Sequence, residues 1–276
     1  MIRSKLIVLL LLVTTFMGHA QTYEWSSVVM DGSRTGCTPL AINNLEGTLG
    51  VFLEDGTYIA PNGRIYAAGS LTARTAAIVR DAQEPMKRVK TVIAYSEEEM
   101  CTYRYETPLS NWYVNMVMNK VSDLSGKKID VGICNFGGIR VNMPKGDVTL
   151  DDMLSMFPFK NYIVYLELKG SELRKIFEKM AQTRFEAVGG VEIVAENKKL
   201  TKALIGGEPI DDEKLYKVAT ISFLLYGGDS LTLAENAVNM HIYDVTIINM
   251  VLEHIENLKK EGKNITPPTD RYVVIK

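Results

Sequence analysis

Histidine is scarce in this chain of 276 residues, which contains only His19, His241 and His254. The three are far apart in the sequence and do not have the spacing of metal ligands. The Gly-x-Ser-x-Gly turn that carries the nucleophile of many serine hydrolases is also absent. The sequence therefore predicts neither a histidine-based metal centre nor a hydrolase of that kind.

Cysteine is almost as rare, and charge of either sign is not in large excess. Cys37, Cys101 and Cys134 are an odd number, so at most one disulfide can form, and no pairing is indicated. Cys134 ends an apolar run and is expected to be buried. The formal net charge is −2, which does not favour a nucleic-acid-binding protein.

Long hydrophobic runs are missing except at the amino terminus. There, Arg3 and Lys5 precede an apolar run over residues 6–13, and Gly18 and Ala20 follow it. This pattern predicts an export signal over residues 1–20, cleaved after Ala20, and a periplasmic or extracellular protein. The apolar run is shorter than the roughly 20 residues that a membrane span needs. After cleavage the net charge is about −4, because Arg3 and Lys5 are removed.

Residues 21–88 are interpreted as an amino-terminal extension. Turn signals at Asp31-Gly32, Asp55-Gly56 and Pro61-Asn62-Gly63 separate short apolar runs, which predicts hairpins, followed by a helix over about residues 72–82. No chemical motif is present in this extension. A cap, a docking surface and an edge extension remain open as its role.

Residues 89–276 are predicted to form one α+β domain, a mixed sheet with packed helices, because strands and helices mix without strict alternation. Helices are expected after Ser110 as N-cap, after the capping box Thr149 to Asp152, from Gly170, and over residues 244–260. Strands are expected at residues 89–95, 129–134, 163–168, 188–194, 199–205, 216–220 and 271–275.

The stretch Asn135-Phe136-Gly137-Gly138-Ile139-Arg140 is the main candidate site. It follows the predicted strand 129–134, so a glycine-rich turn presents Asn135 and Arg140 at a strand end. Strand ends are where mixed α and β proteins place ligand sites, and arginine offers a planar fork of donors to an anion. The alternative is a tight turn with a surface arginine.

Several motifs in order resemble the carboxy-terminal, substrate-specificity domain of the secreted 5'-nucleotidase family, which includes UDP-sugar hydrolases. They are Asn-x-Gly-Gly-Ile-Arg from Asn135, Phe-Pro-Phe-x-Asn ending at Asn161, Val-Gly-Gly from Val188 and Gly-Gly-Asp ending at Asp229. The resemblance covers residues 89–276. Two departures stand out: Ser230-Leu231 follow the Gly-Gly-Asp, and Phe136 holds a place that is often small.

The resemblance implies a nucleotide or nucleoside ligand and a role for each motif. Phe159 and Phe223 would stack on the base, and Asp229 would accept from the ribose hydroxyls. Asn135 and Asn161 would lie at the base or ribose edge. Arg140 would reach the ribose and phosphate, and Arg104 resembles a second phosphate-binding arginine. The alternatives are that Phe159 is a core residue and that Asp229 only closes a turn.

The family's hydrolase domain carries two metal ions, whose motifs this sequence lacks. The leading hypothesis is therefore a specificity domain that contains no cofactor, acting with a separate metallophosphatase chain that holds divalent metal ions. A stand-alone nucleotide-binding protein without catalysis is the second hypothesis. The third is an assembly or surface module that docks through residues 21–88.

Overall fold

The computed structural model describes residues 49–103 and 105–276, which form two compact units divided between Glu84 and Pro85. The predicted signal and Cys37 lie outside the described residues. Cys101 is partly buried and Cys134 is buried, and both are free thiols. Burial raises the pKa of the Cys134 thiol well above its usual range. Among the described residues, no helix is both long and apolar enough to cross a membrane.

The first unit contains a three-stranded antiparallel meander, and helix α3 follows it. The Tyr58 ring lies 4.9 Å from Phe52 and 6.0 Å from Tyr66, measured between ring centroids, so aromatic contacts hold the short strands together. Ser70 caps α3 by accepting from the Ala73 amide. The predicted turns at Asp55-Gly56 and Pro61-Asn62-Gly63 and the helix near residues 72–82 are confirmed, and the turn predicted at Asp31-Gly32 lies outside the described residues. The elements are β1 (Val51–Phe52), β2 (Tyr58–Ile59), β3 (Ile65–Tyr66) and α3 (Leu71–Asp81), with α4 (Gln83–Met86) after them.

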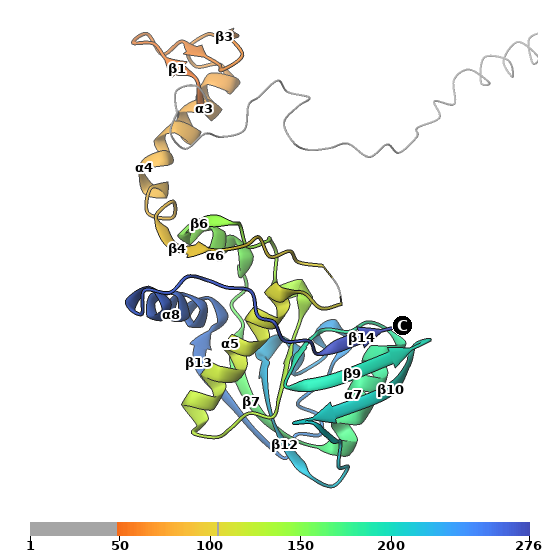
Figure 1. Cartoon of the computed structure of the whole chain (residues 1–276). Helices are drawn as coiled ribbons and strands as arrows, with labels where there is room; N and C mark the ends of the chain where they lie inside the picture. Colours follow the sequence, from red (N-terminus) through yellow and green to blue (C-terminus); the bar gives the residue numbers. More distant parts are fainter. Residues whose placement is uncertain (1–48, 104) are drawn as a thin grey trace, which may run out of the picture. The chain divides into compact units, whose positions relative to one another are not determined.

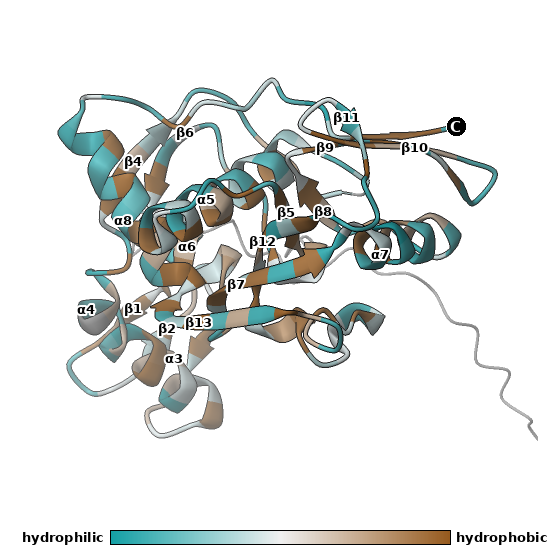
Figure 2. Cartoon of the chain, turned by 90° about the horizontal axis from the view of Figure 1, so that it is seen from below, coloured by the Kyte–Doolittle hydropathy of each residue, from teal (hydrophilic) through white to brown (hydrophobic). Residues whose placement is uncertain are grey.

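The second unit is built on a five-stranded mixed sheet in the order β13-β7-β12-β5-β8. Strands β12 and β5 are parallel, and the other neighbours are antiparallel. Strands β5 and β8 are buried along their whole length and are coloured hydrophobic in Figure 2. The strands are β5 (Val131–Cys134), β7 (Tyr162–Lys169), β8 (Ala187–Gly189), β12 (Leu215–Ile221) and β13 (Asn239–Thr246).

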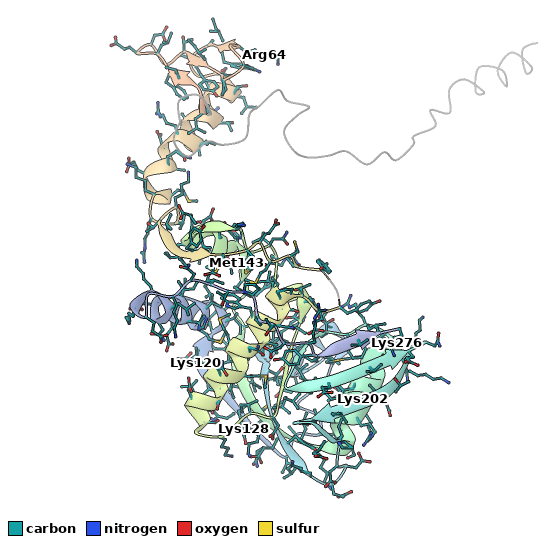
Figure 3. The ribbon with its side chains drawn as sticks, viewed as in Figure 1. Arg64, Lys120, Lys128, Met143, Lys202 and Lys276 are labelled. Atoms are coloured by element: carbon teal, nitrogen blue, oxygen red, sulfur yellow. The ribbon has the colours of Figure 1, made fainter. Side chains whose placement is uncertain are left out.

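A separate four-stranded sheet has the strand order β11-β10-β9-β14. Its carboxy-terminal strand β14 is parallel to β9. The prediction of one strand over residues 188–194 is wrong, because Gly190 has a φ of 74° and turns the chain from β8 into a different sheet. Lys202 and Lys276, labelled in Figure 3, pair with glutamates of β9. The strands are β9 (Val191–Glu196), β10 (Lys199–Ile205), β11 (Glu208–Pro209) and β14 (Val273–Ile275).

A third, two-stranded sheet pairs β4 (Val92–Ser96) with β6 (Gly146–Thr149). The predicted capping box is confirmed: Thr149 accepts from the Asp152 amide, and the Asp152 carboxylate accepts from the Thr149 amide. It opens α6 (Leu150–Met156), which ends before Pro158, as predicted.

Three longer helices cover the sheets, α5 (Pro108–Ser125), α7 (Gly170–Gln182) and α8 (Ile247–Lys260). Helix α5 packs on β5, β7, β8 and β12, and its other side contacts α8, as Figure 1 shows. Helix α7 packs on β7 and β10. The layers bury one continuous core that runs from α5 through the five-stranded sheet. The α+β class is confirmed.

Two predicted helix starts are wrong, for local reasons. The N-cap of α5 is Thr107 rather than Ser110: Thr107 and Ser110 form a reciprocal capping box, and Pro108 takes the first helical position. Helix α8 begins at Ile247 with Thr246 as its cap, because Asp244 belongs to β13. Pairing with β7 keeps residues 239–246 extended.

Glu106 attaches the carboxy-terminal segment to α5. Its carboxylate accepts from the Asn111 Nδ2 at 2.7 Å, from the Tyr272 amide at 2.7 Å and from the Val273 amide at 3.0 Å. Two of these donors are backbone groups at the start of β14, and the carboxylate is their acceptor. It therefore holds the last strand in register beside β9.

Glu167 on β7 is expected to make stability depend on acid pH. Hydrogen bonds from Tyr165, Asn239 and Lys127 lower the pKa of this carboxyl to about 2. An unfolded chain has a glutamate pKa near 4.3, so the contribution of Glu167 is complete above about pH 4.3 and is lost as the pH falls towards 2. Glu167→Gln should lower the melting temperature at pH 7 by roughly 2 to 6 °C.

Thermal unfolding from pH 7 to pH 2 measures this effect. The difference between wild type and Glu167→Gln should narrow only below about pH 4.3. Glu213→Gln is the control, because Glu213 forms an exposed pair with Lys169 and should change little at any pH. A difference that stays constant down to pH 2 would contradict the role of the Glu167 carboxylate.

Candidate functional site

The predicted site residues follow strand ends that meet at one edge of the five-stranded sheet. Strands β5 and β12 are parallel and paired at Val131 and Val218, so Asn135 and Phe223 leave the sheet at the same edge. Strand β7 is antiparallel to β12, so its first residue, Tyr162, lies at that edge too. The Tyr162 amide donates to the Ser222 Oγ at 3.0 Å and ties the two segments together.

Asp229 lies at the centre of the polar contacts in this region. Its Oδ2 accepts from the Asn135 Nδ2 at 3.0 Å, and its Oδ1 accepts from the Arg184 guanidinium at 3.2 Å. Asp229 and Ser230 both have left-handed backbone, with φ of 46° and 64°. Such a conformation in two consecutive residues other than glycine is strained and is common at functional sites. The Asp229 side chain thus links its own turn to Asn135 and Arg184.

Arg184 and Glu186 belong to the same network, and the motif search did not identify them. The Arg184 Nε donates to the Glu186 Oε1 at 3.2 Å, and the Phe136 amide donates to the Glu186 Oε2 at 2.7 Å. The Glu186 side chain is only 3% exposed. The available sequence signal for a buried carboxylate is that Glu186 directly precedes the apolar pair Ala187-Val188.

Arg140 and Phe159 lie beside this network. The Arg140 Nη1 donates to the Gly137 carbonyl oxygen at 3.4 Å, and its Cζ lies 5.8 Å from the centroid of the Phe159 ring. The Phe159 side chain is 46% exposed, so the alternative that it is a core residue is wrong. An exposed ring beside a cation is available for stacking on a planar ligand.

Phe223 stands on a short 3₁₀ turn, η3 (Ser222–Leu224), and is 44% exposed. The Asp229 turn, η4 (Gly228–Ser230), packs against it. A Cβ added at Gly228 would lie 2.8 Å from the Phe223 ring, so the aromatic ring and the Asp229 turn are in direct contact. The two candidate ligand groups are thus fixed relative to each other.

The remaining predicted residues are Asn161, Asn135 and Arg104. The Asn161 carbonyl accepts from the Ile247 amide at 2.9 Å, which joins the start of β7 to α8. Asn135 is buried, and its Oδ1 makes no hydrogen bond within the described part of the chain. That oxygen is itself buried, so Asn135 contributes to the site through the Nδ2 that holds Asp229. Arg104 lies outside the described residues.

His241 and His254 do not take part in this site. The His241 ring lies 4.5 Å from the Tyr243 ring on β13, and the His254 ring on α8 lies 5.9 Å from the Trp112 ring. Burial lowers the pKa of His254, which favours its neutral form. In residues 49–103 and 105–276, no group of three or more histidine, cysteine, aspartate or glutamate side chains is placed to hold a metal ion.

Gly228→Ala is expected to displace the Phe223 turn. The added Cβ would lie 2.1 Å from the Phe223 carbonyl oxygen, so the backbone has to move, at a cost of about 1 to 3 kcal/mol. Thermal unfolding measures the loss. Gly137→Ala is the control, since its Cβ would meet nothing nearer than 3.4 Å. Equal melting temperatures for the two variants would contradict the close packing.

Comparison with known proteins gives one family. Residues 76–236 match the family model described as 5'-nucleotidase, C-terminal domain. Protein UshA of Salmonella pullorum is 32% identical over 146 residues, which cover 50% of this chain and 26% of that protein. The 5'-nucleotidase of Vibrio vulnificus is 27% identical over 48% of this chain and 26% of its own length. The match thus spans about a quarter of these relatives.

Solved structures agree on the fold. The 5'-nucleotidase precursor from Thermus thermophilus is similar with a TM-score of 0.63 and 23% identity, over 82% of this chain and 48% of that chain. The NAD nucleotidase of Haemophilus influenzae has a TM-score of 0.53 and 16% identity, over 79% and 47%. At these identities the likeness concerns the fold alone.

Proposed function

This chain belongs to the 5'-nucleotidase C-terminal domain family, and from that premise we propose that it is the substrate-recognition part of a nucleotide-dephosphorylating system. It binds the nucleoside part of the substrate at the sheet edge described above. A separate metallophosphatase chain supplies the dimetal centre. The chain and its partner would together act in nucleotide breakdown.

The aromatic residues and Asp229 support nucleoside binding. Phe159 and Phe223 are exposed rings on segments joined by the Tyr162 to Ser222 hydrogen bond, and each can stack on one face of a base. Stacking contributes about 1 to 3 kcal/mol per base and tolerates different bases. Asp229, next to the Phe223 ring, accepts hydrogen bonds from the ribose hydroxyls.

The remaining residues are assigned to the edge of the base, the ribose and the phosphate. Asn135 lies at the base or ribose edge and holds Asp229 through its Nδ2, and Asn161 lies at the start of the same strand edge as Phe159. Arg140 binds the ribose and phosphate side, because its guanidinium retains donors that the Gly137 carbonyl does not use. Arg104 serves as the second phosphate ligand in this proposal.

The part of the chain that the structure describes does not fit a dimetal centre, because His241 and His254 lie on different elements and contact aromatic rings. Two-metal sites bring several oxygen and nitrogen ligands around metal ions that lie within about 4 Å of each other. We therefore place the divalent metal ions in the partner chain. No chemical step at a metal is assigned to this chain.

The observation that supports this proposal most directly is a group of contacting residues at one edge of the sheet, in which the Phe159 and Phe223 rings are exposed. The group consists of Asn135, Arg140, Phe159, Phe223 and Asp229. The test is to mix the pure chain with a metallophosphatase that is weakly active alone, and to follow phosphate release from AMP with a divalent metal present. The mixture should raise kcat/KM by roughly tenfold or more, because a bound nucleoside positions the phosphate.

Two controls make this experiment specific. A Phe159→Ala, Phe223→Ala double variant should give no gain, and a metal chelator should abolish phosphate release from the mixture. An unchanged rate on addition of the wild-type chain would overturn the proposal. Phosphate release by the pure chain with metal alone would overturn the assignment of the metal ions to a partner.

A stand-alone binding protein is the second candidate function. It is favoured by the fact that Asn135 and Arg184 already hold Asp229 in this chain, so the ribose group needs no partner to organise it. Calorimetry of the chain with adenosine and AMP separates the two functions. Tight binding without a partner supports the stand-alone protein, and weak binding supports half of a shared site.

We propose in addition that residues 1–20 direct export and are removed after Ala20. The support is the pattern of Arg3, Lys5 and the apolar run 6–13. Cell fractionation with amino-terminal sequencing of the purified chain tests this. A chain that keeps residues 1–20 and remains inside the cell would contradict it.

A further inference from the structure

We infer that Arg184 and Glu186 are positioning residues, which orient the Asp229 carboxylate so that the site selects riboses with two free hydroxyls over 2'-deoxyriboses. This inference rests on the proposed function, since it concerns the ribose of the same ligand. It adds two positioning residues and a preference for ribose over 2'-deoxyribose ligands. The hydrogen bonds around Asp229 support this inference.

The Asp229 carboxylate has a defined number of free acceptor positions. An ionised carboxylate offers about four, two on each oxygen. Asn135 occupies one position on Oδ2, and Arg184 occupies one on Oδ1. Within residues 49–103 and 105–276, no other donor reaches the carboxylate, so one position remains on each oxygen. A cis-diol presents two hydroxyl donors side by side, so it matches these two positions, whereas a 2'-deoxyribose fills only one of them.

Arg184 can hold Asp229 in place because it is itself held. Its guanidinium donates to Asp229 and, through Nε, to Glu186 at 3.2 Å. The Glu186 carboxylate is buried and also accepts from the Phe136 amide at 2.7 Å. Phe136 follows Asn135, which donates to the other oxygen of Asp229. The contacts thus close a ring in which the carboxylate is fixed from both sides.

The backbone of Asp229 needs such support. Asp229 has φ 46° and ψ 33°, and Ser230 also has a positive φ. Left-handed backbone in residues with a Cβ costs free energy and persists when neighbouring contacts over-determine it. The Lys179 ammonium donates to the Ser230 carbonyl, and the Gly227 amide donates to the Leu231 carbonyl at 2.7 Å. Arg184 adds the contact that fixes the side chain.

An ordinary surface ion pair would not have this arrangement. A half-exposed arginine that pairs with one exposed carboxylate contributes little. Arg184 instead joins two carboxylates on different segments, one of them buried, and its planar fork holds both at defined angles. A lysine at this position has a single point charge and cannot fix both carboxylates in the same way.

The test compares adenosine with 2'-deoxyadenosine by ligand-observed NMR titration, which detects weak binding to the full chain. Wild type should bind adenosine about tenfold more tightly, since a hydrogen bond to a charged group is replaced by none. In Arg184→Met this ratio should fall to roughly one to three, while the affinity for 2'-deoxyadenosine changes by less than about twofold.

Two further variants separate positioning from folding. Glu186→Gln keeps an acceptor for the Phe136 amide but turns an amide donor towards Arg184, so it should lower the same ratio to an intermediate value. Arg174→Met is the matched control, because Arg174 also pairs with a carboxylate and a carbonyl but lies near the start of α7 and binds the segment before β12. It should leave the ratio unchanged.

The outcomes of this titration distinguish a failure of the inference about Arg184 and Glu186 from a failure of the proposed function. A ratio in Arg184→Met equal to that of wild type, with both nucleosides still bound, would overturn this inference and leave the proposed function intact. A wild-type chain that binds neither nucleoside, with or without the metallophosphatase, would overturn the proposed function and this inference with it. A loss of affinity for both nucleosides by the same factor would also overturn the selective role.

Discussion

Replacing Phe159 and Phe223 together by alanine is expected to lower the affinity for adenosine by about a hundredfold or more. Each stacked face contributes about 1 to 3 kcal/mol, and both faces of the base lose their ring. The rings are 46% and 44% exposed, so their removal leaves no cavity in the core and should hardly change the melting temperature. Calorimetry or NMR titration with adenosine measures the loss.

The matched control for this prediction is Tyr95→Ala. Tyr95 lies on β4 and is 47% exposed, so the change removes a similar ring from a different surface. Adenosine affinity should then stay at the wild-type value. If the double variant bound adenosine as well as wild type does, the two rings would not form the base site, and the assembly-module hypothesis would gain support.

The second large effect is expected from Glu106→Gln, which acts on stability. The carboxylate accepts from three donors, among them the Tyr272 and Val273 amides at the start of β14. A glutamine turns its amide donor towards one of those N–H groups, so at least one charged hydrogen bond is lost and one donor faces another. The free energy of unfolding should fall by about 2 to 4 kcal/mol.

For a unit of this size, such a loss lowers the melting temperature by roughly 4 to 16 °C. Hydrogen exchange at Val273–Ile275 should increase more than exchange in β7, because β14 detaches first. Glu253→Gln is the control, as Glu253 pairs with the Lys120 ammonium at the surface and should cost little. Unchanged exchange in β14 would show that Glu106 does not anchor it.

The fold could be predicted where one local signal decides the structure. Thr149 and Asp152 form a capping box from their own spacing, and the apolar positions of α7 define one buried face. The sequence-based predictions were wrong where pairing with a neighbouring strand determines the local structure. Residues 244–246, expected to begin the last helix, belong to β13, which pairs with β7, and the long strand expected at 188–194 divides at Gly190 between two sheets.

The candidate site likewise has residues that the sequence predicts and residues that it does not. The turn after Asn135, the Phe-Pro-Phe step and the Gly-Gly-Asp loop are visible as motifs because glycine and proline mark turns. Arg184 and Glu186 are not visible, because their partners are distant: Arg184 binds a carboxylate 45 residues later, and Glu186 binds an amide 50 residues earlier. Only the strand pairing brings those segments together, and a periodic pattern does not specify it.

Asn135 and Asp229 are far apart in the sequence, so a chain that is being synthesised completes this site late. Asn135 leaves the ribosome 94 residues ahead of Asp229, its hydrogen-bond partner. At about 5 to 20 residues per second, translation holds the two apart for roughly 5 to 20 seconds. A nascent polypeptide therefore carries Asn135 without its partner for that interval, and a chain that ends after Phe159 and before Asp229 lacks the carboxylate to which the proposed function assigns the ribose.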